Sequence, residues 1–295
     1  MKSILRRSLT ATVCVFAITG SATAAEGHWK ERALPKLQPS RAATALSYKD
    51  QPVDTAAAQN REPLVVLEDY GIACDSFYAR RDGFNLPYGR AFAGAEASPR
   101  LRLGLARKLQ QVNESLKGQG LEVLVLDGYR PVALQAQLFQ FFKERAAREY
   151  PRAGDAMLKS MAGRYCSSAE QFQKNNPRTW PTHATGAAVD LTLRTIVTKE
   201  PLFMGGIFDD DSELSHTTYF EKPAKLSGLS RQTARENRRI LYWAMFSAGF
   251  ENYPYEWWHY DCGNQMWLMN RKNRLRQQGE TVSAEKAYYG LPDNI

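Results

Sequence analysis

The spacing of apolar residues along the chain predicts three long helices. The first begins at Ser98, a capping residue followed by proline, and ends near Gly118. Its apolar positions recur at helical intervals: Leu101, Leu105, Leu109, Val112 and Leu116. A second helix is expected from about Pro131 to Tyr150, and a third from its cap at Ser230 to Gly249.

Short apolar runs between these helices predict strands. They occupy residues 64–67, 121–126 and 187–193, and the aromatic stretch 253–262 is expected to end in a further strand. Helices and strands are therefore mixed without a regular alternation. We predict an α+β fold, with a mixed, mainly antiparallel sheet packed by helices in a single domain over residues 62–295.

The chain before this domain shows neither pattern. Residues 1–24 combine early positive charge, an apolar run and the small residues Ala22-Thr23-Ala24, which is the layout of a cleaved secretory signal. The competing interpretation is an uncleaved anchor, but the run is short for a membrane span. Residues 25–61 are rich in Ala, Gln, Pro, Ser and charge, which predicts a flexible lead-in. We therefore expect a periplasmic or secreted protein with no stable membrane insertion after cleavage.

Charge and cysteine content narrow the classes of function. Cleavage after residue 24 would lower the formal net charge from +8 to +5, and no basic cluster is large enough to predict nucleic-acid binding. A small positive net charge is compatible with a protein that acts near anionic cell-envelope polymers. An ordinary solvated surface explains this charge equally well. The remaining cysteines are Cys74, Cys166 and Cys262. Export predicts one disulfide among them, and the sequence leaves its pairing open.

Two polar motifs point to a metal. His183 and Asp190 stand seven residues apart, and a carboxylate within the buried strand at Asp190 is costly unless it is paired or metal-bound. Glu256 and His259 stand three residues apart among large aromatics. Alone, each motif also fits a structural role, a paired aspartate or an aromatic core segment. Together, two imidazoles and a carboxylate form a common ligand set for catalytic zinc, with Glu256 available as a base.

A turn at Asp127-Gly128-Tyr129-Arg130-Pro131 supplies a candidate cation. An arginine at a strand end, followed by a rigid proline, can be aimed with little loss of entropy. Asp127 is available to hold Arg130. The competing interpretation of this turn is a structural salt bridge at the start of a helix.

These motifs, in this order, resemble the D-alanyl-D-alanine dipeptidases, a group that includes the vancomycin-resistance dipeptidases. The group lies within a wider superfamily of zinc D,D-carboxypeptidases. The resemblance runs from about Tyr70 to Trp267. Five ordered segments carry it, which are residues 75–84, 127–131, 183–193, 208–216 and 256–260.

The resemblance implies roles for individual residues. One zinc ion per chain would be held by His183, Asp190 and His259. Glu256 matches the general base that takes a proton from zinc-bound water, and Arg130 matches the residue that steadies the oxyanion.

The resemblance also bears on substrate recognition. Tyr78 and Asp209 match positions near the amino end of the substrate, and His216 either shapes the same pocket or is structural. Pro181 stands where the family usually has serine, and Gly83 precedes Phe84 where asparagine is usual. Both departures concern the substrate rather than the metal.

The implied activity is hydrolysis of the dipeptide D-Ala-D-Ala by a zinc metallopeptidase. One alternative is a D,D- or L,D-carboxypeptidase that trims peptidoglycan stem peptides with the same zinc site and a different cleft. The other alternative is a non-catalytic cell-wall-binding protein on the same fold. In both enzymatic cases the partner is a small peptide.

Overall fold

The computed structural model describes residues 29–36, 48–163, 165–210, 212–223 and 228–293. Its central sheet has five strands in the order β2-β4-β5-β7-β6. The strands are β2 (Ala73–Cys74), β4 (Leu121–Asp127), β5 (Ala188–Thr195), β6 (Glu251–Asn252) and β7 (His259–Asp261). Only the β2–β4 pair of this sheet is parallel, and the other three pairs are antiparallel. The expected mixed, mainly antiparallel sheet is therefore confirmed.

One face of this sheet is apolar and covered by two helices. Val123 lies opposite Leu193, and Val125 lies opposite Leu191, so their side chains project from the same face. All four are fully buried. Helices α1 (Leu103–Lys117) and α4 (Leu229–Ser247) contact each other and pack on β4 and β5 respectively. Because side chains alternate along a strand, the residues between these apolar positions point to the opposite face.

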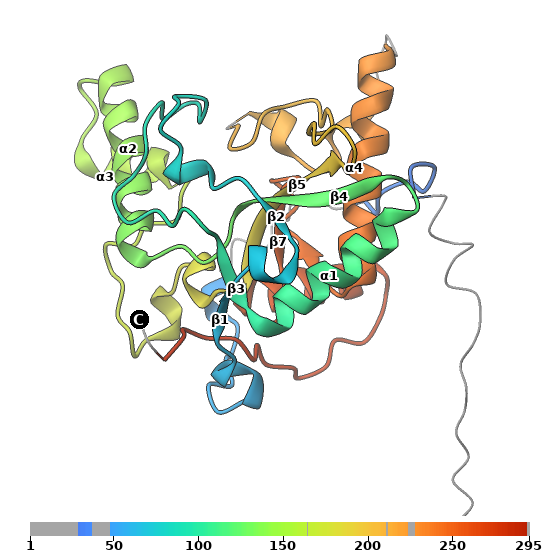
Figure 1. Ribbon diagram of the computed structural model, residues 1–295. Helices are drawn as coiled ribbons and strands as arrows, with labels where there is room; N and C mark the ends of the chain where they lie inside the picture. Colours follow the sequence, from blue (N-terminus) through green and yellow to red (C-terminus); the bar gives the residue numbers. More distant parts are fainter. Residues whose placement is uncertain (1–28, 37–47, 164, 211, 224–227, 294–295) are drawn as a thin grey trace, which may run out of the picture.

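The remaining elements surround the other face and the ends of the sheet. Helices α2 (Val132–Glu149) and α3 (Asp155–Ala162) pack against each other at one side of the molecule (Figure 1). Strands β1 (Leu64–Val66) and β3 (Arg100–Arg102) form a small antiparallel pair. Helix α5 (Gln265–Gln277) follows β7. Helices α3 and α5 are additional to the three that the sequence predicts.

The first helix begins later than the sequence predicts, because a short strand occupies the start of the predicted segment. Arg100–Arg102 pairs with β1, and α1 begins only at Leu103. The guanidinium of Arg102 is buried and donates to backbone carbonyls of Asn60, Glu62, Thr185 and Gly290. These long-range partners hold the segment extended. The third helix begins after Gly228 rather than after a cap at Ser230, and it ends at Ser247.

Parts of the predicted flexible lead-in are packed into the structure, which corrects that prediction for them. Trp29 and Leu34 are buried. The short helix η3 (Tyr48–Asp50) lies against α5, and the Gln265 side chain donates to two of the neighbouring backbone carbonyls. The predicted secretory signal, residues 1–24, lies outside the described residues. Among those described, no helix has the length and apolar character needed to cross a membrane.

The cysteines do not form the predicted disulfide. Cys74, Cys166 and Cys262 are all free thiols. Cys74 lies in β2, Cys166 follows α3, and Cys262 directly follows β7. The fold thus places the three cysteines in separate parts of the domain.

Candidate metal centre and active site

The sheet register brings three of the polar side chains into one row. After a register shift between Val125 and Asp127, Asp127 on β4 lies opposite Asp190 on β5, and Asp190 lies opposite His259 on β7. Directly opposed residues of antiparallel strands project from the same face. Asp190 alternates with the core residues Val189 and Leu191, so the row lies on the face away from the apolar layer.

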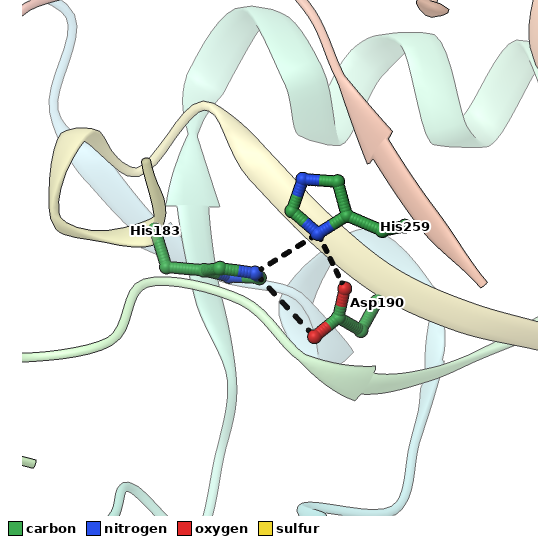
Figure 2. Close-up of side chains that lie close together, drawn as sticks. All are labelled: His183, Asp190 and His259. Atoms are coloured by element: carbon green, nitrogen blue, oxygen red, sulfur yellow. Dashed lines mark hydrogen bonds and ion pairs between the residues drawn. The ribbon is translucent and has the colours of Figure 1, made fainter. Parts of the chain in front are cut away.

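His183 joins this row from the turn that precedes β5. It begins the short helix η8 (His183–Thr185), and Gly186 ends that helix at a φ of 67°. A Cβ at Gly186 would lie 2.3 Å from a methyl carbon of Leu64, so a larger residue would also force that side chain to move. Nδ1 of His183 is 2.8 Å from the Gly128 carbonyl, which leaves Nε2 directed towards Asp190 and His259 (Figure 2).

Two of the three contacts among the predicted ligands have the spacing of a tetrahedral zinc site. Nε2 of His183 lies 3.3 Å from Nδ1 of His259 and 3.4 Å from Oδ2 of Asp190. Bonds of about 2.0–2.2 Å in tetrahedral geometry place ligand atoms about 3.3–3.6 Å apart. The third pair, His259 Nδ1 and Asp190 Oδ1, is at a hydrogen-bond distance of 2.9 Å. Nitrogen from two imidazoles and oxygen from a carboxylate suit zinc, and the set leaves a fourth position open.

The charges of this cluster are strongly coupled. Burial disfavours a charged imidazole at His259, but the carboxylates of Asp261 and Asp190 outweigh it and raise the pKa of His259 well above its usual value. Burial alone would raise the pKa of Asp190, and the two neighbouring histidines instead lower it below the ordinary range. The cluster therefore favours ionised Asp190, the form of the carboxylate that binds cations.

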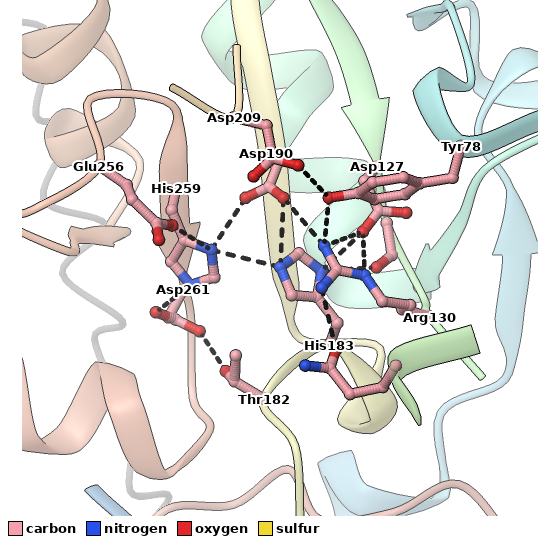
Figure 3. Close-up of polar contacts among 12 residues, drawn as sticks. Tyr78, Asp127, Arg130, Thr182, His183, Asp190, Asp209, Glu256, His259 and Asp261 are labelled. Atoms are coloured by element: carbon pink, nitrogen blue, oxygen red, sulfur yellow. Dashed lines mark hydrogen bonds and ion pairs between the residues drawn. The ribbon is translucent and has the colours of Figure 1, made fainter. Parts of the chain in front are cut away.

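Arg130 lies beside the same cluster and is held on several sides (Figure 3). Its Nε and Nη2 atoms lie 2.8 and 2.7 Å from Oδ2 of Asp127, which confirms the expected partner. Nη1 donates to Gln135 at 2.9 Å, and Nη2 lies 3.3 Å from Asp190 Oδ2. These contacts fix the guanidinium plane next to the candidate metal ligands.

A second group of polar side chains links Arg130 to Asp209. Nη2 of Arg130 lies 3.3 Å from the hydroxyl oxygen of Tyr78, and that hydroxyl donates to Oδ2 of Asp209 at 3.2 Å. The hydroxyl of Tyr88 donates to the same oxygen. Burial raises the pKa of Asp209 to about 6, although both hydrogen bonds act in the opposite direction. Asp209 has a φ of 62°, a left-handed conformation that aspartate tolerates better than most residues.

Glu256 approaches the cluster from a turn rather than a strand. The amide of His259 donates to the carbonyl of Glu256, so the chain bends between them as the E-x-x-H spacing requires. Oε2 of Glu256 lies 3.8 Å from Nδ1 of His259, and the side chain is 31% exposed. Partial burial, together with the charges of Asp190 and Asp209, raises the pKa of Glu256 to about 8. A carboxyl group with such a pKa can accept or donate a proton near neutral pH.

All seven predicted site residues line one cavity of about 410 Å³, which are Tyr78, Arg130, His183, Asp190, Asp209, Glu256 and His259. Pro181 and Tyr48 line it too, so the packed part of the lead-in contributes to its wall. His216 packs edge-to-face on Tyr255, itself a lining residue of the cavity, with ring centroids 5.2 Å apart.

Sequence reasoning missed several side chains that complete the site. Gln135 accepts a hydrogen bond from Arg130, and Tyr88 donates one to Asp209. Asp261 contacts Nε2 of His259, the ring nitrogen that faces away from Asp190. Tyr88 and Gln135 have no distinctive motif. Asp261 stands two residues after His259, so strand alternation could have placed it on the same face.

Comparison with known proteins identifies the family of the chain. A sequence model of the Peptidase M15 family, described as D-ala-D-ala dipeptidase, matches residues 64–277. The D-alanyl-D-alanine dipeptidase of Synechocystis sp. is 32% identical over 217 residues, which is 69% of this chain and 85% of that protein. The D-alanyl-D-alanine dipeptidase of Enterococcus faecalis is 31% identical over 194 residues, covering 65% and 86% of the two chains.

Solved structures give a weaker likeness. A variant of the vancomycin-resistance D,D-pentapeptidase VanY in complex with Zn(II) is 18% identical, with a TM-score of 0.37. The alignment covers 65% of this chain and 84% of that one.

Proposed function

Because the chain belongs to the Peptidase M15 family of D-ala-D-ala dipeptidases, we propose that it is a zinc metallopeptidase that hydrolyses D-Ala-D-Ala. One observation carries the proposal beyond family membership. The three candidate ligands, a carboxyl group suited to proton transfer and a fixed arginine all face the same cavity.

His183, Asp190 and His259 would hold the zinc ion. Bound zinc supplies a Lewis acid that polarises a carbonyl and lowers the pKa of water. The chain prepares the ligands for this role, since the Gly128 carbonyl orients His183 and the sheet register places Asp190 beside His259. Preorganised ligands of this kind bind a metal without a large rearrangement.

Glu256 would act as the general base. Its Oε2 atom faces Nδ1 of His259, so water in this part of the cavity lies within its reach. The carboxylate would take a proton from the attacking water and then return it to the amine that leaves. Proton transfer by a positioned carboxylate typically contributes about 10²–10⁴ to the rate.

Arg130 and Asp209 would bind the two charged parts of the reaction. The Arg130 guanidinium can donate to the oxygen that becomes negative as the carbonyl is attacked, and its contacts with Asp127 and Gln135 hold it there beforehand. Asp209 would pair with the free amino group of the substrate. The Arg130–Tyr78–Asp209 contacts set the spacing of these two charges, which favours a short peptide with a free amine.

The decisive experiment compares substrates of different length on zinc-loaded protein. We expect a higher kcat/KM on free D-Ala-D-Ala than on a pentapeptide stem that ends in the same two residues. A preference for the stem would instead identify a carboxypeptidase, and zinc binding without hydrolysis of either substrate would identify a wall-binding protein.

We further propose that the protein acts outside the cytoplasm, in the periplasm or after secretion. The layout of residues 1–24 as a secretory signal supports this location. Cell fractionation and N-terminal sequencing of the mature protein test it. Full-length protein in the cytoplasmic fraction would contradict it.

A further inference from the structure

The side of His259 that faces away from the candidate metal centre meets a second carboxylate. Nε2 of His259 lies 3.0 Å from Oδ2 of Asp261, while Nδ1 faces Asp190 and His183 (Figure 3). His259 and Asp261 are two residues apart on β7, so both project from the same face of the sheet. Asp261 is completely buried. A buried carboxylate is costly unless its oxygens are satisfied, so its partners decide what it does.

The other oxygen of Asp261 is satisfied by two neutral donors. Oδ1 accepts from the hydroxyl of Thr182 at 2.7 Å and from the side-chain amide of Asn264 at 2.6 Å. The same Asn264 nitrogen also lies 2.9 Å from Thr182 Oγ1. Neither partner is a cation. The hydrogen bond to the imidazole is therefore the contact through which Asp261 balances its charge.

These contacts tie together the segments that carry the candidate ligands. Thr182 directly precedes His183, and Asn264 caps helix α5 by accepting from the amide of Trp267. Asn264 also donates to the carbonyl of Ala187, just before β5, the strand of Asp190. One small polar cluster thus holds the turn of His183, the start of β5 and the strand of His259 in fixed positions.

We propose that Asp261 is a positioning residue for the metal centre: its carboxylate accepts the Nε2 proton of His259 and so presents Nδ1 as the metal-binding atom. The inference rests on the proposed zinc site. Histidine ligands commonly donate their second ring nitrogen to a carboxylate, which fixes the tautomer and makes the ligand nitrogen more basic. Asp261 also prevents His259 from turning over, since a flipped ring would break the Nε2 contact.

The test measures zinc affinity rather than turnover. We expect Asp261→Asn, which keeps the shape of the side chain and removes its charge, to raise the zinc Kd about 10–100-fold in competition with a chelator. Asp261→Ala should weaken binding at least as much. An unchanged Kd in a folded Asp261→Asn variant would overturn the proposal.

Glu251 offers a matched control. It lies opposite Asp261 on the neighbouring strand β6 and is also buried, but its carboxylate pairs with Arg274 at 2.7 Å. Glu251→Gln should lower the Tm without changing the zinc Kd. If Glu251→Gln raises the zinc Kd as much as Asp261→Asn does, the effect is general loss of stability and the positioning role is wrong.

A measurement on the wild-type chain keeps the proposal testable even if the Asp261 variants do not fold. Nitrogen NMR of histidine-labelled, zinc-loaded protein should show His259 protonated at Nε2 and bound through Nδ1. Binding through Nε2 would overturn the role of Asp261 and leave the zinc site intact. Failure of the wild-type protein to bind one zinc ion would overturn the proposed function itself.

Discussion

Nδ1 of His259 lies 2.9 Å from Oδ1 of Asp190, at directly opposed positions of strands β7 and β5. The pairing is a consequence of register: a shift of one residue in either strand would turn one side chain to the apolar face. It also makes the candidate centre sensitive to protons, because the carboxylates of Asp261 and Asp190 raise the pKa of His259 well above its usual value.

Zinc binding should therefore release protons. In protein prepared without zinc, His259 holds a proton at neutral pH, and a metal on Nδ1 must displace it. We expect the zinc Kd to rise as the pH falls, by about tenfold per pH unit for each proton displaced. Calorimetry in buffers of different ionisation enthalpy measures the protons released. The His259→Ala variant should no longer bind one zinc ion per chain. In the wild type, zinc binding without proton release would contradict the charge state assigned to His259.

Replacement of Glu256 should separate chemistry from metal binding. Glu256→Gln and Glu256→Ala should retain one zinc ion, because Glu256 is outside the proposed ligand set. Both should lower kcat about 10²–10⁴-fold through loss of the base. The measurements are metal content and steady-state hydrolysis of D-Ala-D-Ala. Near-normal turnover in either variant would rule out the proposed proton transfer.

Arg130→Ala should impair both catalysis and stability. Loss of one donor to the developing oxyanion typically lowers kcat about 10²–10³-fold. The variant also leaves the buried Asp127 carboxylate without its main partner, which costs about 3–5 kcal/mol of the free energy of unfolding. Kinetics well below the Tm and chemical denaturation measure the two effects separately.

Arg194 provides the control for Arg130. It lies near the other end of β5 and pairs with Glu122 at 2.8 Å. Arg194→Ala should leave kcat unchanged. An Arg130→Ala variant that raises KM and keeps kcat would contradict a role in the transition state.

Asp209→Asn should weaken substrate binding and remove a pH dependence. Asparagine tolerates the left-handed backbone, so the change mainly removes charge. Because the pKa of Asp209 is about 6, KM for D-Ala-D-Ala should fall as the pH rises through 6 in the wild type. Loss of a charged hydrogen bond of about 1.5–3 kcal/mol should raise KM by about 10–100-fold in the variant.

The neighbouring Asp210 is the matched control for this experiment. Its carboxylate accepts from the amide of Ser212, and Asp210→Asn should leave KM and its pH profile unchanged. An unchanged KM in Asp209→Asn would remove Asp209 from the amine site.

The raised pKa of Asp209 also affects folding. The folded chain binds this proton more tightly than the unfolded chain, whose pKa is near the ordinary 3.8. The stability contributed by protonation is therefore complete below about pH 4 and is lost as the pH rises through about 6. Asp209→Asn should abolish this part of the pH dependence of the free energy of unfolding.

Local patterns determined much of the fold. The apolar runs that became β4 and β5 and the periodic segment that became α2 were predicted within a few residues. The Arg100–Arg102 strand was missed because Leu101 fits the helical spacing of the following residues equally well. Its strand pairing and the carbonyl partners of Arg102 come from distant parts of the chain, which local periodicity does not contain.

For the candidate site, the sequence by itself determined the residue types, their order and their likeness to a family. The His183 to Asp190 and Glu256 to His259 spacings pointed to a metal site, and the likeness to the family added roles for Arg130 and Asp209. Only the tertiary structure decided which atoms face one another. The register of β4, β5 and β7 set Asp127, Asp190 and His259 in one row, and the contact of His259 Nε2 with Asp261 leaves Nδ1 facing Asp190. Such choices depend on strand pairing between residues far apart in the chain, and sequence spacing does not specify that pairing.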